Sequence, residues 1–145
     1  MKVQVYDIHS GINSNAIDAL EEYNQTRSRE EIKKNPSTIT ITTAVCEGDR
    51  IVISIRDNGP GIPETIRNQI FAPFFSTKPV NKGTGLGLSI SYQIVVENHG
   101  GELRCEDTPQ GGTEFIIKLP ITQKLKKNNL EKCPNASLNQ LLLGF

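Results

Sequence analysis

The sequence has no tryptophan, no excess charge of either sign and no long apolar run. Its 16 basic and 16 acidic residues cancel, which argues against a nucleic-acid or membrane surface held by bulk positive charge. No apolar stretch approaches the roughly 20 residues that cross a bilayer, and the first residues lack the apolar core and cleavage site of a signal peptide. We therefore expect a cytoplasmic protein that contacts neither nucleic acid nor membrane.

Cysteine is scarce and follows no pattern. The three cysteines, Cys46, Cys105 and Cys133, form no C-x-x-C pair, and their number is odd. A disulfide framework or a cysteine metal site is therefore not expected. We interpret these residues as small apolar side chains that fill space.

Length and composition suit one domain. The chain has 145 residues, of which 36% are hydrophobic and 22% are charged, as is ordinary for a globular protein with a single core. Beyond residue 121 the sequence is rich in lysine and asparagine and loses its apolar periodicity. We expect one domain over residues 1–121 and a poorly ordered polar tail over residues 122–145.

Hydrophobic periodicity predicts alternating helices and hairpins. Ile12, Ala16, Leu20 and Tyr23 recur at helical spacing. The expected helices cover residues 12–34, 63–70 and 86–99, the last apolar on nearly all sides and therefore buried; the expected strands cover residues 38–46, 50–56, 103–106 and 114–119. This order predicts an α+β fold, a two-layer α/β sandwich with helices on one face of a mixed, mainly antiparallel sheet.

The segment Asp57-Asn58-Gly59-Pro60-Gly61 directly follows a predicted strand. A carboxylate at a strand end can accept a hydrogen bond from the amino group of an adenine. Gly59 and Gly61 permit the positive φ of a tight turn and the close approach of a base. Taken alone, the segment is equally compatible with an ordinary glycine turn.

A second candidate, Asn15, lies on the first predicted helix beside its apolar stripe. Its amide oxygen is a hard ligand for Mg²⁺, which prefers few protein ligands together with phosphate oxygens. Taken alone, a polar helix residue that points to solvent is the simpler interpretation.

A third segment places Phe71, Phe74 and Phe75 in a loop over residues 71–85. Three exposed rings are costly, so we expect them to pack and to anchor one end of the loop, which leaves residues 80–84 mobile. Lys78 stands where the mobile part begins, and its ammonium can meet a phosphate as a point charge. The alternative is a minor hydrophobic cluster beside a solvated lysine.

The fourth segment, Gly83-Thr84-Gly85-Leu86-Gly87-Leu88-Ser89, opens the predicted helix over residues 86–99. Bare backbone amides and a helix N-terminus together form an anion site, and glycines let phosphate oxygens reach those amides. The G-x-G-x-G spacing differs from the dinucleotide-binding and Walker patterns. Taken alone, the segment also fits a flexible linker.

In order, the four segments resemble the N, G1, F and G2 boxes of the catalytic domain of sensor histidine kinases. That domain belongs to the ATPase superfamily shared with gyrase, the Hsp90 chaperones and the MutL proteins. The resemblance covers Asn15 to Leu119 and rests on DNGPGI, FAPFFSTKP and GTGLGLSI. The segment from Gly111 to Phe115 resembles the closing strand of the family. The resemblance implies ATP and Mg²⁺ as cofactors.

The resemblance also implies a role for each matching residue. Asn15 resembles the Mg²⁺-binding asparagine, Asp57 the adenine-binding aspartate, and Thr113 a second contact beside the base. The other cofactor-binding residues that it implies are those of the turn, the loop lysine and the phosphate loop: Gly59, Gly61, Lys78, Gly83, Thr84, Gly85, Leu86, Gly87 and Leu88.

Two departures accompany the resemblance. A second asparagine, usual one turn before Asn15, is replaced by Gly11, and residues 6–10 do not follow the family pattern. This predicts a loop or distorted turn there, and weaker polar support for the triphosphate. The strand and the histidine-bearing helical hairpin that precede the domain in the family are missing, and neither His9 nor His99 lies in the required context. We therefore expect an N-terminally truncated domain without a phospho-accepting histidine.

For function, the resemblance implies a protein histidine kinase of two-component signal transduction. Such a domain transfers the γ-phosphoryl group of ATP to a histidine on a separate dimerisation domain, and a response regulator receiver domain is the further partner. Because that histidine is absent, we expect the chain to be inactive alone. The alternative is a module that binds a nucleotide or a partner without turnover. A third possibility, another ATPase of the superfamily, is disfavoured by the phenylalanine-rich loop.

Overall fold

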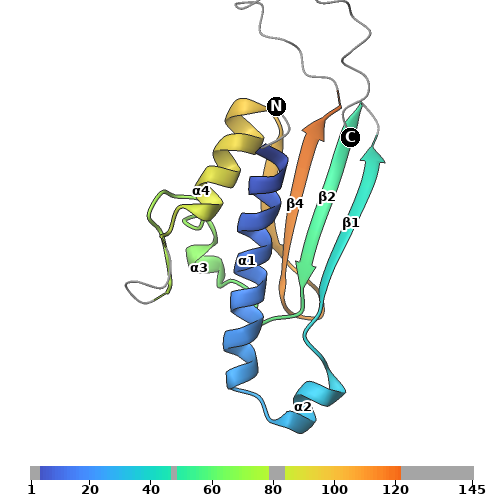
Figure 1. Ribbon diagram of the computed structural model, residues 1–145, viewed down its shortest axis with the longest axis vertical. Coiled ribbons are helices and arrows are strands. Elements are labelled where there is room, and N and C mark those ends of the chain that lie inside the picture. Colours follow the sequence, from blue (N-terminus) through green and yellow to red (C-terminus); the bar gives the residue numbers. More distant parts are fainter. Residues whose placement is uncertain (1–3, 47–48, 79–83, 122–145) are drawn as a thin grey trace, which may run out of the picture.

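The computed structural model describes residues 4–46, 49–78 and 84–121. Helices cover one face of a four-stranded sheet (Figure 1), which confirms the predicted two-layer α+β fold. The elements in chain order are α1 (Gln4–Gln25), α2 (Arg29–Lys34), β1 (Ile39–Cys46), β2 (Arg50–Asp57), α3 (Glu64–Arg67), α4 (Gly87–Tyr92), the π-helix η1 (Gln93–Asn98), β3 (Glu102–Asp107) and β4 (Thr113–Pro120).

The strands follow the order β1-β2-β4-β3. Every pairing among the described residues is antiparallel. A mixed, mainly antiparallel sheet was expected, and the described part contains no parallel pair. In the register, Ile55 of β2 stands between Ile41 of β1 and Phe115 of β4. Because side chains alternate across a strand, this register places Ile41, Ile55 and Phe115 together on the helical face, whereas Val52 and Ile116 lie on the opposite face.

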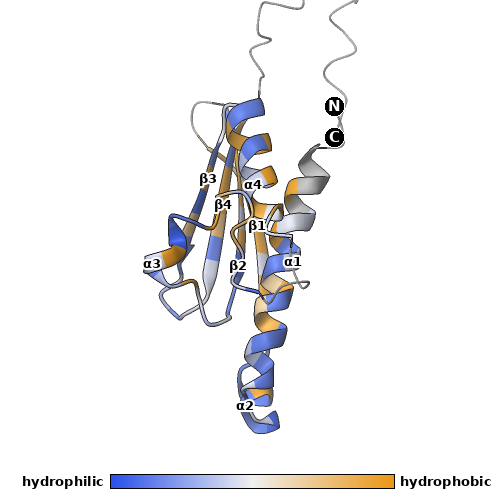
Figure 2. Ribbon diagram, turned by 90° about the vertical axis from the view of Figure 1, so that its left-hand side faces the viewer, coloured by the Kyte–Doolittle hydropathy of each residue, from blue (hydrophilic) through white to orange (hydrophobic). Residues whose placement is uncertain are grey.

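The core forms between that face and α1. Ile8, Ile12, Ala16 and Leu20, each four residues apart, are all buried, as expected for the apolar stripe of a helix packed on a sheet. The other buried apolar residues are Ile55, Ile70, Ile94, Val95, Leu103, Phe115 and Ile117. Viewed from the side, α1 stands along one side of the sheet (Figure 2).

The first helix differs from the prediction at both ends. It begins at Gln4 rather than at residue 12, and residues 6–10 are helical rather than a distorted turn, because Ile8 continues the buried stripe. It ends at Gln25, and Ser28 starts α2 with a capping box. The Ser28 hydroxyl accepts from the Glu31 amide (3.2 Å), and the Ser28 amide donates to the Glu31 carboxylate (2.8 Å). This box is a recognised helix-start signal.

The helix predicted over residues 86–99 is present as α4 followed by η1, and Gly100 ends it with φ 63°. The expectation that it is buried all round is wrong. Ser91 is 1% exposed, whereas Ile90 is 46% exposed. The sides of the helix that face α1 and the sheet are covered, whereas Ile90 on another side remains at the surface.

Two predictions fall on residues that are not described. Residues 79–83, which hold most of the predicted mobile segment, and residues 122–145, the predicted tail, both lie outside the described ranges. Within the described ranges, no helix is long and apolar enough to cross a membrane.

Candidate functional site

Asp57 is the last residue of β2, and it is only 4% exposed. Its Oδ1 accepts hydrogen bonds from the backbone amides of Gly59 (2.9 Å) and Thr113 (3.3 Å). Both bonds that the described residues donate to this carboxylate end on the same oxygen. The second oxygen, Oδ2, is therefore left as an acceptor for a ligand.

Burial controls the electrostatics of this carboxylate. It raises the pKa of Asp57 above the ordinary value, and the two backbone hydrogen bonds from Gly59 and Thr113 lower that pKa only in part. A buried carboxylate with an unused oxygen gains most from a ligand that donates a hydrogen bond, because the charged form lacks water. The arrangement is that of a recognition site for an N–H donor.

Glycines allow three backbone segments to meet around Asp57. A Cβ on Gly59 would lie 2.9 Å from Asp57 Oδ1, and Gly61 has a φ of 79°. Gly112, with a φ of 98°, brings β4 so close that a Cβ there would overlap the Asp57 carbonyl oxygen. Sequence reasoning missed this role of Gly112, although the glycine pair before Thr113 was a visible signal.

Asn58 is a second residue whose role the sequence reasoning missed. Its Oδ1 accepts from the Thr38 amide (2.8 Å), and its Nδ2 donates to the Pro36 carbonyl (2.9 Å). The side chain thus ties the turn after β2 to the chain that enters β1. Asparagine commonly stabilises turns in this way, so the Asp-Asn-Gly sequence was a usable signal.

The phenylalanine-rich loop is anchored by two rings rather than three. Phe71 and Phe75 pack against the core, and the Phe71 ring lies 5.5 Å from that of Tyr92 and 6.5 Å from that of Phe115. Phe74 is 77% exposed and has a φ of 64°, so the expectation that all three rings pack is wrong. The backbone of Phe74 is held elsewhere, because its amide donates to the Gly85 carbonyl (3.0 Å).

This contact joins the phenylalanine-rich loop to the glycine-rich segment. Gly85 has a φ of 64°, and a Cβ there would lie 2.6 Å from the carbonyl carbon of Phe74. The Leu86 amide lies 3.4 Å from the Thr84 hydroxyl oxygen. Gly87 begins α4, and a Cβ there would meet nothing within 4 Å. Backbone amides beside open space suit a site for an anionic group.

The remaining predicted residues of this segment are placed differently. Gly83 lies outside the described residues. Leu88 is partly buried and packs against the core. Its side chain therefore anchors α4, and only its backbone is available to a ligand.

Lys78 is paired with a carboxylate on α1. Its Nζ donates to Oδ2 of Asp18. Asp18 stands three residues after Asn15, so the two share one face of α1. Asn15 itself is half-buried, which agrees with a position at the border of the core. The ion pair was not anticipated, because the two residues are 60 positions apart.

Gly11, at the position of the asparagine that the resemblance leads one to expect, lies at a helix crossing. A Cβ there would come within 3.3 Å of the Ser91 hydroxyl oxygen and 3.5 Å of the Gly87 carbonyl oxygen. The Ser91 hydroxyl in turn donates to that Gly87 carbonyl (3.0 Å). A small residue is needed here for α1 to approach the first turn of α4.

The structure therefore brings the predicted residues together in two groups. One surrounds Asp57 at the end of the sheet, and the other links the loop of Lys78 to α1. A cavity of about 410 Å³ adjoins the first group on its α3 side, where Gly61, Arg67 and Gly112 are among its lining residues but Asp57 is not. Among the described residues, no three His, Cys, Asp or Glu side chains gather into a metal site.

Comparison with known families supports an ATPase. A family model described as "Histidine kinase-, DNA gyrase B-, and HSP90-like ATPase" matches residues 3–123. The signal transduction histidine-protein kinase AfsQ2 of Streptomyces coelicolor is 40% identical over 92 residues, which are 61% of this chain and 17% of that protein. The sensor histidine kinase CpxA of Escherichia coli is 34% identical over 111 residues, which are 74% of this chain and 24% of that protein.

The solved structures that resemble this chain are also histidine kinases. The catalytic domain of histidine kinase ThkA matches with a TM-score of 0.64 at 32% identity, covering 82% of this chain and 67% of that one. Full-length ShkA in complex with AMPPNP matches with a TM-score of 0.65 at 24% identity, a likeness that concerns the fold alone. This chain spans about a quarter or less of the two curated relatives above.

Proposed function

The chain belongs to the histidine kinase-, DNA gyrase B- and HSP90-like ATPase family, as the ATP-binding catalytic domain of the sensor histidine kinase type, and we propose that it binds Mg²⁺ and ATP and transfers the γ-phosphoryl group to a histidine. That histidine belongs to a separate dimerisation domain. The proposed setting is two-component signalling in the cytoplasm, with a response regulator receiver domain as the subsequent acceptor.

One observation carries the proposal most directly, namely the buried carboxylate of Asp57. Its Oδ1 is held by the Gly59 and Thr113 amides, which fixes the direction of the unused Oδ2. An adenine presents an exocyclic amino group, which is the N–H donor that such an oxygen needs. Gly59 and Gly61 keep side chains away from the place where the base would lie. Thr113 then acts as the second contact beside the base.

The phosphates would lie at the glycine-rich segment that leads into α4, which contacts the loop that holds Lys78. Gly85 and Gly87 offer backbone amides, and Gly87 borders open space. Thr84 and Gly83 belong to the same proposed cradle. The Lys78 ammonium is paired with the Asp18 carboxylate. On nucleotide binding it would leave this carboxylate and pair with a phosphate oxygen instead.

Asn15 fits a Mg²⁺ ion that shares its ligands with phosphates. It is a half-buried amide on α1, one turn from the Asp18 carboxylate, and Mg²⁺ is commonly held by one or two protein oxygens plus substrate phosphates. When bound, the ion neutralises phosphate charge. Asn15 would hold the ion through its amide oxygen.

The transfer itself needs little covalent help from this chain. An imidazole nitrogen of the accepting histidine forms a bond to the γ-phosphorus, the bond from that phosphorus to the bridging oxygen breaks, and ADP leaves with the electron pair. Positioning and charge neutralisation supply most of the acceleration in such reactions. This chain contributes the position of the nucleotide, and its partner contributes the nucleophile.

Radiolabelled ATP tests the proposal. The chain alone should bind nucleotide but acquire no label, and adding a dimeric helical hairpin that bears a histidine beside an acidic residue should place acid-labile label on the hairpin. Label on the lone chain would reveal an internal acceptor and contradict the assignment of roles. Unlabelled hairpin, despite nucleotide binding by calorimetry, would contradict the transfer.

A nucleotide-binding module without turnover is the second candidate. It is favoured by Gly11, which replaces a polar residue near the triphosphate with a helix contact. Gly11→Asn distinguishes the two in the same assay. If polar support is what limits turnover, the substitution should raise transfer to the hairpin. If helix packing dominates, it should lower stability instead, because the added side chain meets Ser91.

A further inference from the structure

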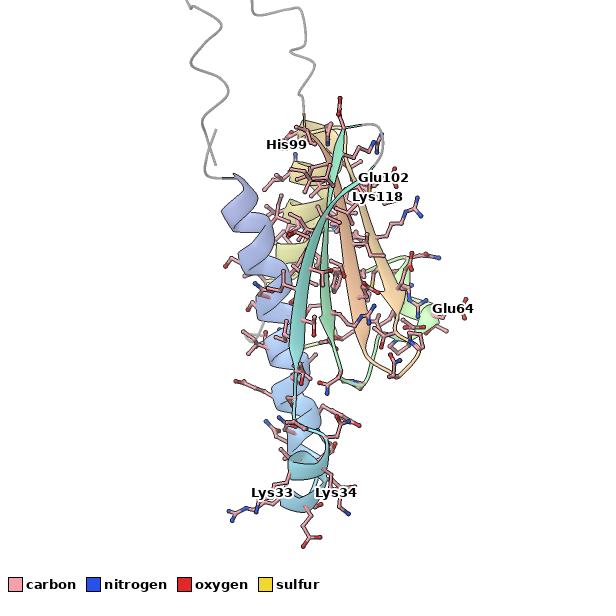
Figure 3. The ribbon with its side chains drawn as sticks, turned by 90° about the vertical axis from the view of Figure 1, so that its right-hand side faces the viewer. Lys33, Lys34, Glu64, His99, Glu102 and Lys118 are labelled. Atoms are coloured by element: carbon pink, nitrogen blue, oxygen red, sulfur yellow. The ribbon has the colours of Figure 1, made fainter. Side chains whose placement is uncertain are left out.

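The short helix α2 lies at one end of the molecule, where the side chains of Lys33 and Lys34 point away from the sheet (Figure 3). The described part of the chain buries none of its six residues. An isolated helix of this length is not stable in water. The position of α2 therefore depends on polar contacts with its neighbours, and Arg27 makes several of them.

Arg27 lies between the end of α1 and the end of α2. Its Cζ lies 5.1 Å from the centre of the Tyr23 ring, and its Nη1 donates to Asn24 Oδ1 (3.3 Å). Its Nη2 donates to the carbonyl oxygens of Glu31 (2.8 Å) and Asn35 (2.6 Å). Asn35 is the C-cap of α2, and cations commonly bind the carbonyls at this end of a helix. One side chain thus fastens α2 and the residue after it to α1.

The residues that follow α2 carry this contact to the turn after β2. The Asn58 Nδ2 donates to Asn35 Oδ1 (3.3 Å) and to the Pro36 carbonyl oxygen (2.9 Å). The Asn58 Oδ1 accepts from the Thr38 backbone amide (2.8 Å), and the Asn58 backbone amide donates to the Thr38 carbonyl (3.3 Å). Asn58 directly follows Asp57. Hydrogen bonds therefore connect Arg27 to the residue next to the buried carboxylate.

We propose that Arg27 is a positioning residue for the nucleotide, and that it acts through Asn58 on the carboxylate of Asp57. This inference rests on the proposed function, because it takes the base to bind at Asp57. The Asp57 Oδ1 accepts from the Gly59 backbone amide (2.9 Å), so the direction of the carboxylate depends on the path of the turn. Without Arg27, residues 35–38 are held less firmly, Asn58 moves with them, and Oδ2 is aimed at the base for a smaller share of the time.

Calorimetry with ADP tests the inference. Arg27→Met should lower the affinity about three- to tenfold. Arg27→Lys keeps the charge but not the fork of donors, so its loss should be smaller. Arg29→Met removes the same charge from an exposed position of α2 and is the matched control, which should bind ADP as the parent chain does. Urea unfolding checks that every variant folds.

A double-mutant cycle shows whether Arg27 acts through Asn58. Asn58→Ala should lower the ADP affinity by a similar factor. Adding Arg27→Met to Asn58→Ala should cause little further loss, because the path from the guanidinium to the turn is already cut. Two residues that merely stabilise the fold at independent sites would give losses that add.

Amide exchange without nucleotide measures the turn directly. The Gly59 amide should exchange faster in Arg27→Met than in the parent chain or in Arg29→Met. Ile117, which is 1% exposed in the central strand β4, reports the stability of the whole domain. The exchange of Gly59 should increase more than that of Ile117, because the loosening is local.

The outcomes separate this inference from the proposed function. Unchanged ADP affinity in Arg27→Met, an equal loss in Arg29→Met, additive losses in the cycle, or unchanged exchange of Gly59 would each overturn the inference. If Asp57→Asn lowers the affinity while Arg27→Met does not, the proposed base site stands and only the positioning role of Arg27 falls. If Asp57→Asn leaves the affinity unchanged, the proposed base site falls, and the inference falls with it.

Discussion

Replacing Asp57 by asparagine separates recognition from stability at the proposed adenine site. The substitution exchanges one oxygen for an amino group in a residue that is 4% exposed. The remaining amide oxygen can still accept from Gly59 and Thr113 in the place of Oδ1. The local hydrogen bonds therefore survive, and the fold should be retained.

The pKa of Asp57 gives the direction of the stability change. Burial raises the pKa of this carboxyl in the folded chain, so the folded state binds more protons than the unfolded state between the ordinary and the raised pKa. The free energy of unfolding therefore falls as pH rises through that window. Asparagine carries no charge, so Asp57→Asn should lose this dependence and should be no less stable than the parent chain at neutral pH.

Nucleotide affinity, in contrast to stability, should fall in Asp57→Asn. The new amino group faces the adenine amino group as a second donor, and a charge-assisted bond is lost. Such a bond contributes about 1.5–3 kcal/mol, which corresponds to a loss of roughly ten- to a hundredfold in affinity. In the parent chain, affinity should fall as pH is lowered through the raised pKa, because protonation removes the acceptor.

Calorimetry with ADP and urea unfolding at several pH values measure both effects. Asp49→Asn is the matched control. It makes the same chemical change at an exposed turn residue that precedes β2, at the other end of the strand from Asp57. Unchanged ADP affinity in Asp57→Asn, or an equal loss in Asp49→Asn, would refute the assignment of the base to Asp57. A loss of affinity accompanied by unfolding would refute the argument that the hydrogen bonds survive.

Other changes test other parts of the site. Gly112→Ala should destabilise the chain by about 1–3 kcal/mol in urea unfolding, because its φ is 98° and its Cβ would overlap the Asp57 carbonyl; normal stability would mean that β4 can move aside. Lys78→Met should weaken ATP binding about tenfold and leave adenosine binding unchanged, whereas equal losses would argue against a phosphate contact. Burial raises the pKa of Cys105 to about 12, so mass mapping after alkylation at mildly alkaline pH should find Cys46 modified well before Cys105; equal rates would contradict that burial.

Local signals in the sequence were sufficient for the elements of the fold. The alternation of isoleucines predicted the hairpin of β1 and β2, and Gly100 predicted the end of the long helix. Two errors at this level had readable signals. Ile8 extends the stripe of α1 by one turn, and Ser28 with Glu31 separates α1 from α2. Both signals lie within a few residues, so the start of α1 and the break before α2 could have been predicted from the sequence.

Local signals could not give the contacts between distant segments, and only the family resemblance had placed Thr113 near the base expected at Asp57. The amide of Thr113 reaches Asp57 across 56 residues, and Lys78 reaches Asp18 across 60. No periodicity within a segment specifies these partners, because they depend on how the strands and helices pack. The exposure of Phe74 has the same origin, since its backbone is held by Gly85.

Local sequence patterns were enough to predict most of the strands and helices, and to identify side chains with the chemistry to bind a base, a metal and phosphates. Side-chain type and spacing act over a few residues, so this information is present in the chain before it folds. Only the packing of distant segments brings Gly112 against Asp57 and Lys78 against the Asp18 carboxylate. Each of these depends on the strand order β1-β2-β4-β3 and on the packing of α1, because burial and contact arise only when distant segments meet.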